Sequence, residues 1–528
     1  MRLHGPTAKS KLLAVMKYIA VFLIILITAS NVYGKLEVPH ILSDNMVLQR
    51  NAKLRIWGKG DDATTVTVVF KKQQQSTVVE NGQWTIWLNP EQAGGPYEMV
   101  ISSGTETITL QNILIGEVWV SAGQSNMQFL LSKSVNAEKV MNAPANPEIR
   151  WFNQHGNGTI APAFDNDGSW VDANPQSRKW THAVSYYFAL SLYEDLQIPI
   201  GIVKAAIGGT NAQQWTPLKV LEENPDLKHY ADAVKALYPA LSIKIAEHPE
   251  QLAVYKKKVK EAKAAGKTVP KRPRNPGITF TTGLYNGMIG PVENFTTKGV
   301  LWYQGEANSR ADLAIEYRTL LPEMIKGWRE GYQNPELYFL IVQLPRFRWN
   351  RDFDWAALRE AQQLTADTLP YTGMAVIIDT GDEEDIHPPL KKPAGDRLAL
   401  IARGKVYGEE VEHSGPVFSE ATISESSVII SFNHGGEGLI SQDNEDLREF
   451  TICGGDKKFL PATAVVEGNT VVVSHPEIQT PVAVRYAWQN YPLVNLFGRN
   501  GLPAAPFRTD KFPLPGEPIA ANDEHGKN

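Results

Sequence analysis

A serine and an asparagine follow a strongly apolar segment in the first quarter of the chain. Residues 117–122 are mostly apolar and alternate into Val118 and Val120, which predicts a buried strand, and Gly123 ends it. Ser125 and Asn126 come next, before residues that can begin a helix. A serine there exposes its hydroxyl, and the free N–H groups of a helix start can stabilise an oxyanion. The residues therefore predict a nucleophile, and the alternative is that they only cap the helix.

Three later predicted strands also end in polar or glycine-rich segments. The segments after these strands are 208–211, 304–308 and 379–388. Because ligands bind beyond the carboxyl ends of the strands in open α/β sheets, we expect these segments to meet around Ser125. Together they would supply amide donors, close backbone N–H groups, an acid and an imidazole. A nucleophile with these groups is the equipment of acyl transfer.

Asp385 and His387 are the candidate acid and base. In an extended segment, residues two apart project to the same side, and a following proline favours that geometry at His387. The carboxylate can then orient one imidazole nitrogen while the other faces Ser125. The alternative is that residues 383–385, which are all acidic, form a solvated loop. A histidine followed by two prolines has no evident structural task there, which favours the catalytic interpretation.

The elements that position these groups divide the chain into regions. Residues 35–112 contain short strand-like segments separated by Gly, Pro and Asn, which predicts an N-terminal β-sandwich-like domain. Residues 113–405 alternate apolar strands with helices, which predicts a parallel sheet covered on both faces. Residues 406–515 predict a C-terminal antiparallel β domain, and residues 516–528 a loose tail. The predicted fold class is therefore α/β with two flanking β domains.

A helical segment, about residues 224–276, interrupts this alternation. Its second half is strongly basic, with nine lysines and arginines between residues 256 and 274. We interpret it as a solvated helical hairpin inserted between two strands of the sheet. The alternative is a lid or a contact for an anionic glycan.

Residues 1–34 have the pattern of a signal peptide. Lysines precede the apolar run 18–27, and small and polar residues lead to a cleavage site after Gly34. The run is shorter than the ~20 residues that a spanning helix needs. We expect an exported protein, periplasmic or extracellular, with no membrane association after cleavage.

Net charge and cysteine content limit the kinds of partner, compartment and metal site that this protein can be expected to have. The formal net charge of -5 gives no reason to expect a nucleic-acid partner. Cys453 is the only cysteine, so no internal disulfide can form, which suits a bacterial periplasmic or surface protein. No His/Cys cluster has the spacing of a zinc site.

The motifs resemble those of the sialate O-acetylesterase family in the SGNH hydrolase superfamily. They are 123–127 (Gly-Gln-Ser-Asn-Met), 208–210, 302–308 and 385–397, and the likeness includes 284–291 and 501–508. The resemblance runs over nearly the whole mature chain. It implies an SGNH-hydrolase-like sheet and deacetylation of O-acetylated sugars without metal or organic cofactor. Acetyl-xylan, xyloglucan or pectin esterases are the alternative, and a non-catalytic glycan-binding protein is a further one.

The resemblance also implies roles for single residues. It makes Ser125 the nucleophile, His387 the general base and Asp385 its orienting partner. The oxyanion hole it implies consists of the Ser125 N–H, a glycine N–H, for which we choose Gly209, and an amide of the third motif. Gln304 is the first choice for that amide and Asn308 the second.

One departure from the superfamily concerns the acid. Two residues usually separate the acid from the histidine, whereas a single residue separates Asp385 from His387. Glu384 holds the alternative position.

Overall fold

A computed structural model describes residues 35–348 and 353–517 of the chain. The predicted signal peptide and most of the predicted tail lie outside these residues. None of the helices within the described ranges is long and apolar enough to cross a membrane.

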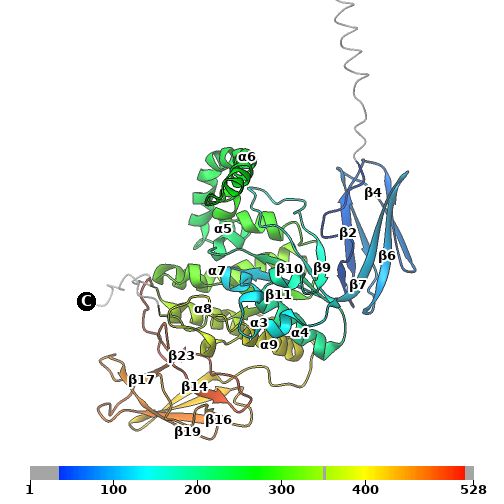
Figure 1. Cartoon of the computed structure of the whole chain (residues 1–528). Coiled ribbons are helices and arrows are strands. Elements are labelled where there is room, and N and C mark those ends of the chain that lie inside the picture. Colours follow the sequence, from blue (N-terminus) through cyan, green and yellow to red (C-terminus); the bar gives the residue numbers. More distant parts are fainter. Residues whose placement is uncertain (1–34, 349–352, 518–528) are drawn as a thin grey trace, which may run out of the picture.

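The centre of the molecule is a sheet with helices on both faces (Figure 1). Its strands lie in the order β13-β12-β11-β7-β10-β8-β9. Their bounds are β7 Glu106–Gly123, β8 Asn146–Phe152, β9 Trp170–Ala173, β10 Ile200–Ala206, β11 Gly299–Tyr303, β12 Tyr338–Val342 and β13 Thr372–Ala375. All neighbours along this path pair in parallel except β9, which is antiparallel to β8. The predicted α/β class with a parallel sheet is confirmed.

The predicted boundary near residue 112 falls inside a strand. β7 is continuous from Glu106 to Gly123 and changes partners along its length. Its first part pairs with β6, Gly94–Ser103, and with β1, Val47–Gln49, whereas its second part pairs with β10 and β11. The strand that leads to Ser125 is therefore anchored in both the N-terminal and the central sheet.

The N-terminal region contains short strands, as predicted. Besides β1 and β6 they are β2 Leu54–Lys59, β3 Thr65–Phe70, β4 Gln73–Val78 and β5 Gln83–Leu88. β3 pairs with β4 and β6, and β2 pairs with β5, all antiparallel. The C-terminal strands are β14 Val417–Ser424, β15 Ser427–Asn433, β16 Leu439–Ser441, β17 Phe450–Cys453, β18 Leu460–Pro461, β19 Thr463–Glu467, β20 Thr470–Ser474, β21 Ala483–Tyr486, β22 Leu496–Gly498 and β23 Phe507–Arg508. They also pair antiparallel, which confirms that part of the prediction.

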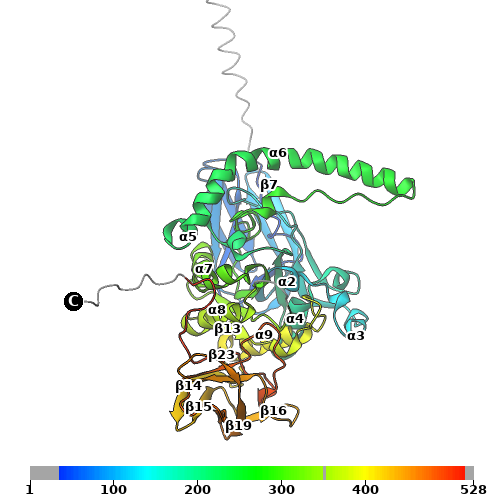
Figure 2. The same ribbon diagram turned by 90° about the vertical axis from the view of Figure 1, so that its left-hand side faces the viewer.

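The predicted insertion contains one long helix, α6, Lys228–Ala264. Its first half packs on the body through Ala231, Val234 and Leu241, and its second half projects away from it (Figure 2). The chain then returns without regular structure to a turn at Pro276–Thr279. The basic residues therefore lie on an arm surrounded by solvent.

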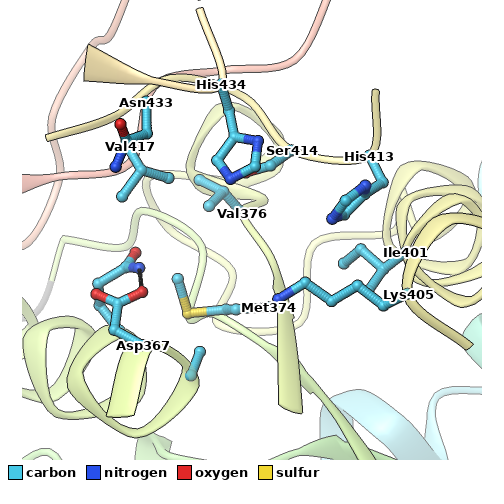
Figure 3. A pocket seen from close by; sticks show the side chains of 12 residues that line it. Asp367, Met374, Val376, Ile401, Lys405, His413, Ser414, Val417, Asn433 and His434 are labelled. Carbon is cyan, nitrogen blue, oxygen red and sulfur yellow. Dashed lines mark hydrogen bonds between the residues drawn. The ribbon is translucent and has the colours of Figure 1, made fainter. Parts of the chain in front are cut away.

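The C-terminal strands and the central body meet at a polar seam. A cavity of about 120 Å³ lies between the end of α8, Trp355–Thr368, and residues 413–434. Asp367, Lys405, His413 and His434 point toward it (Figure 3). It shares no lining residue with the pocket at Ser125.

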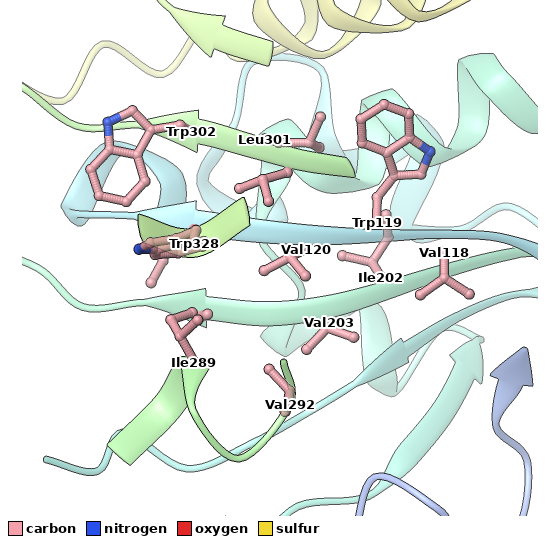
Figure 4. Packing of buried hydrophobic residues seen from close by; sticks show 14 of the residues in the cluster. Val118, Trp119, Val120, Ile202, Val203, Ile289, Val292, Leu301, Trp302 and Trp328 are labelled. Atoms are coloured by element: carbon pink, nitrogen blue, oxygen red, sulfur yellow. The ribbon is translucent and has the colours of Figure 1, made fainter. Parts of the chain in front are cut away.

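Two tryptophans show how the helices cover the sheet. Trp302 of β11 pairs in register with Ala122 of β7, and Trp119 lies three residues before Ala122, so the indoles face opposite sides. Trp302 packs against Trp328 of α7, Ala311–Gly331, with ring centroids 6.0 Å apart. Trp119 packs against Phe188 of α4, Ala183–Leu196, with ring centroids 5.1 Å apart. Figure 4 shows Trp119, Trp302 and Trp328 among the buried side chains around the sheet. The remaining helices are α2 Ser125–Gln128, α3 Ala137–Met141, α5 Leu218–Glu223 and α9 Lys392–Ile401.

Candidate active site

Ser125 stands directly beyond the carboxyl end of β7. Gly123 has φ +138°, and a Cβ there would lie 2.1 Å from the carbonyl oxygen of Tyr303, so only glycine fits between β7 and β11. The Gln124 N–H donates to that same carbonyl at 3.0 Å. The predicted helix after Ser125 is a single turn, α2, so its dipole is small. Ser125 is therefore positioned by the contact between two strand ends.

His387 lies against Ser125, although 262 residues separate them in the chain. The distance between His387 Nε2 and Ser125 Oγ is 2.8 Å, which is a hydrogen bond. The imidazole is 39% exposed, so substrate and water can reach it. This geometry lets the ring accept the hydroxyl proton during an attack by Oγ.

Asp385 lies on the other side of the imidazole, but it does not hydrogen-bond the ring. Its Oδ1 is 3.7 Å from His387 Nδ1 and accepts the His387 backbone N–H at 2.8 Å. The Glu384 side chain forms no hydrogen bond or ion pair with His387 within the described residues, and the Glu384 N–H donates to Asp382. Of the two candidate acids, the structure brings Asp385 to the histidine.

Burial and two charges act on the protonation of His387. Desolvation is the largest effect and lowers its pKa below the usual 6.5. Asp385 opposes this by raising the pKa, and Lys391 lowers it further. The neutral, proton-accepting form is thus favoured.

The loop after β10 lies against Ser125. A Cβ at Gly208 would be 3.4 Å from the Ser125 Cβ, and the Gly208 N–H donates to Gln128 Oε1 at 2.9 Å. Gly209 follows with φ +70°, a conformation that favours glycine, and open space lies on its Cβ side. The N–H groups of Gly209 and Ser125 make no hydrogen bond to any described residue.

Gln304 and Asn308 are fully buried beside the pocket rather than in it. The Gln304 amide nitrogen donates to the Thr210 carbonyl at 3.1 Å and to Asn308 Oδ1 at 2.8 Å. The Asn308 amide nitrogen donates to Gln213 at 3.0 Å. Neither amide has an exposed donor, which corrects the expectation that one of them faces an oxyanion.

The pocket around Ser125 has a volume of about 620 Å³. Its lining consists of Ser125, Gln128, Phe129, Leu130, Lys133, Asp385, His387 and Pro389. Lys133, which ends the 3₁₀ turn Leu131–Lys133, is exposed and forms no ion pair with a described residue. The sequence pattern does not predict this part of the pocket, because nothing in the short segment after α2 indicates which side chains face the serine.

Comparisons with known proteins agree with this geometry. Residues 115–391 match the family model described as carbohydrate esterase, sialic acid-specific acetylesterase. Sialate O-acetylesterase of Mus musculus is 29% identical over 498 residues, which cover 85% of this chain and 89% of that protein. The human sialate O-acetylesterase is 26% identical over 506 residues, with 85% and 87% covered.

A solved structure is similar over nearly its whole length. The crystal structure of a carbohydrate acetylesterase from Xanthomonas citri is 32% identical, with a TM-score of 0.78. The alignment covers 90% of this chain and 100% of that one. The serine esterase geometry, the family match and this likeness identify a carbohydrate O-acetylesterase. The chain belongs to the sialic acid-specific acetylesterase family of carbohydrate esterases.

Proposed function

We propose that Ser125, His387 and Asp385 carry the deacetylation. His387 Nε2 takes the proton of Ser125 Oγ as this oxygen attacks the acetyl carbonyl carbon. The tetrahedral intermediate collapses to an acetyl-enzyme, and the sugar oxygen leaves with the proton from His387. Water then attacks the acetyl group with His387 again as base, which releases acetate and restores Ser125. The 2.8 Å contact between His387 and Ser125 is the observation that carries this assignment.

We assign the oxyanion hole to the backbone N–H groups of Ser125 and Gly209. Neither donor has a partner among the residues that the structure describes, and the Gly208–Gly209 loop lies against the serine. We assign Gln304 and Asn308 to holding this loop instead, since Gln304 binds the Thr210 carbonyl that follows it. Backbone donors suit the task because they are fixed before the charge develops.

Replacing the nucleophile tests the mechanism. We expect Ser125→Ala to lower kcat for acetate release from p-nitrophenyl acetate by roughly 10⁴- to 10⁶-fold. A fluorophosphonate probe should label the unchanged protein at Ser125 and leave the variant unlabelled. Retained hydrolysis, or labelling of another serine, would refute the assignment.

We propose an acidic acetylated sugar, a sialic acid, as the substrate. Relatives named sialate O-acetylesterase support it, and so does Lys133 on the wall of the pocket. An unpaired ammonium there can attract a sugar carboxylate, whereas acetylated xylan or xyloglucan offers it no charge. Arg348, in the loop after β12, is already paired with Glu383 and is therefore a poorer candidate for this contact.

A comparison of two lysines tests the substrate. We expect Lys133→Ala to raise KM for O-acetylated sialic acids about tenfold, as the loss of one charged contact predicts. Hydrolysis of p-nitrophenyl acetate and acetylated xylo-oligosaccharides should be unchanged. Lys139→Ala is the control, because Lys139 is exposed nearby but lines a different cavity. A KM for O-acetylated sialic acids that is the same in Lys133→Ala as in Lys139→Ala and the native protein would exclude this role of Lys133.

We also propose that the protein is exported to the periplasm or the extracellular space. The support is the pattern of residues 1–34, a charged start followed by an apolar run and small residues. Fractionation of the native host, with N-terminal sequencing, should find the mature protein starting near Lys35 outside the cytoplasm.

A further inference from the structure

A buried amide joins the two segments that carry Ser125 and His387. Asn126, the residue after Ser125, is 0% exposed. Its Nδ2 donates to the carbonyl oxygen of Ile386, the residue before His387, at 2.9 Å. This hydrogen bond ties the two segments directly to each other beneath the pocket.

Two buried ionisable groups hold that amide from opposite sides. The Asn126 Nδ2 donates to Glu306 Oε1 at 2.5 Å, and Lys391 Nζ donates to Asn126 Oδ1 at 2.5 Å. Glu306 is 5% exposed and Lys391 2%. A carboxylate only accepts and an ammonium only donates, so they fix which way the amide points.

A contribution to stability alone does not explain why these two ionisable groups are buried around Asn126. Burial is the main effect on both groups, raising the pKa of Glu306 and lowering that of Lys391 to about 7. Their mutual attraction opposes these shifts. A buried ion pair adds little net stability compared with apolar side chains, but it holds a specific geometry.

The position of the His387 ring depends on hydrogen bonds to the backbone of its own segment. Asp385 does not hydrogen-bond the ring of His387 and instead accepts its backbone N–H. The place of the ring is therefore set by the backbone, which Asp385 holds at His387 and Asn126 holds at Ile386.

We propose that Glu306, Asn126 and Lys391 form a positioning unit that sets the distance between Ser125 and His387, and that the charge of Lys391 acts on the imidazole. None of its members lines the pocket, so the unit acts through Ser125 and His387 rather than on the substrate. Its members come from the first, third and last motifs, so it connects three strand ends.

The charges around His387 shift its pKa in known directions. Asp385 raises this pKa and Lys391 lowers it, Glu306 interacts electrostatically with Lys391, and Lys133 lines the same pocket. Removing the charge of Lys391 raises the pKa of His387. Because the base must be neutral, the acid limb of the pH profile then moves to higher pH.

The first experiment replaces Lys391 with the uncharged Met. We expect Lys391→Met to lower kcat on p-nitrophenyl acetate by about 10- to 100-fold, as a displaced catalytic pair does, with KM unchanged. The acid limb of kcat/KM should move to higher pH. Lys392→Met is the matched control, because Lys392 is exposed and forms its ion pair with Asp396, and both readouts should stay as in the native protein.

Glu306→Gln is a second variant that tests the same electrostatic role if Lys391→Met does not fold. The Gln oxygen can still accept from Asn126, but Lys391 loses its counter-charge and becomes neutral more readily. The acid limb should again move to higher pH, with a smaller loss of kcat than in Lys391→Met.

Asn126→Asp should be the most damaging change, because it sets two carboxylates against each other and removes the donor to Ile386. Its kcat should fall by about 100-fold, and adding Glu306→Gln should restore part of it.

An unshifted acid limb in both Lys391→Met and Glu306→Gln would overturn the electrostatic role. Native kcat in folded Asn126→Asp would overturn the positioning role. Ser125 labelling by a fluorophosphonate tests the esterase mechanism separately.

Discussion

At the scale of single residues, burial and two opposite charges set the pKa of His387. Activity requires the neutral imidazole, so it is present above the pKa of His387 and lost as the pH falls through it. Asp385 raises this pKa. We therefore expect Asp385→Asn to move the acid limb of kcat/KM to lower pH. Its kcat should also fall, because the imidazolium of the transition state loses its stabilising charge. The pH dependence of p-nitrophenyl acetate hydrolysis measures both.

The neighbouring carboxylate provides the control for that prediction. Glu384 is exposed and forms no hydrogen bond or ion pair with His387 in the described structure, so Glu384→Gln should leave the profile and kcat as they are. If Glu384→Gln shifted the limb and Asp385→Asn did not, Glu384 would be the acid.

At the scale of elements, the basic arm of α6 stands apart from the working parts of the protein. Beyond Leu241 no residue of the helix is buried, and charges in solvent contribute little to stability. We expect reversal of Lys256, Lys257, Lys258 and Lys260 to Glu to leave Tm and kcat/KM on p-nitrophenyl acetate unchanged. Thermal unfolding and esterase assays check this. A large loss in either would show that the arm packs on the body or closes over the pocket.

The element that matters most for the site is β7. One strand carries the chain from the N-terminal sheet through the central sheet to Ser125, so the predicted boundary near residue 112 does not separate two mobile parts. A strand paired on both sides along its second half holds its end rigidly, which suits a nucleophile that must stay within a fraction of an ångström of its base.

At the scale of the whole molecule, a buried arginine fastens the C-terminal strands to the central body. Arg359 of α8 is 0% exposed and donates to the carbonyls of Leu344, Pro345, Gln489 and Asn490. Burial lowers its pKa to about 9. Arg359→Met would leave the carbonyls of Leu344 and Gln489 without a donor, whereas Pro345 and Asn490 keep the donors Trp355 Nε1 and Phe347 N–H. At about 1–3 kcal/mol for each unsatisfied carbonyl, we expect a loss of about 2–6 kcal/mol of stability, seen as a clear drop in Tm.

Arg310 offers the comparison at the surface. It is exposed and pairs with Asp312 two residues away, so Arg310→Met should barely change Tm. Equal changes of Tm in the two variants would mean that the hydrogen bonds of Arg359 do not hold the body and the C-terminal strands together.

Sequence and tertiary structure each determined a separate part of this site. The order of strands and the polar residues after them were readable from the sequence, since apolar periodicity reports burial and parallel strands end at one edge. This pattern predicted that Ser125 and His387 meet. The helix predicted after Ser125 is only a single turn, because packing against neighbouring segments decides where so short an element ends.

The direction of each polar side chain was decided by the tertiary structure alone. Gln304 and Asn308 were predicted beside the oxyanion but turn inward, because buried carbonyls and amides from distant segments need their donors. Lys133 came to the pocket, and Asn126 came between Glu306 and Lys391, through contacts across more than 150 residues. Local sequence determines which groups reach the end of a sheet. Which of them face the substrate and which are buried beneath it depends on partners that meet only in the folded chain.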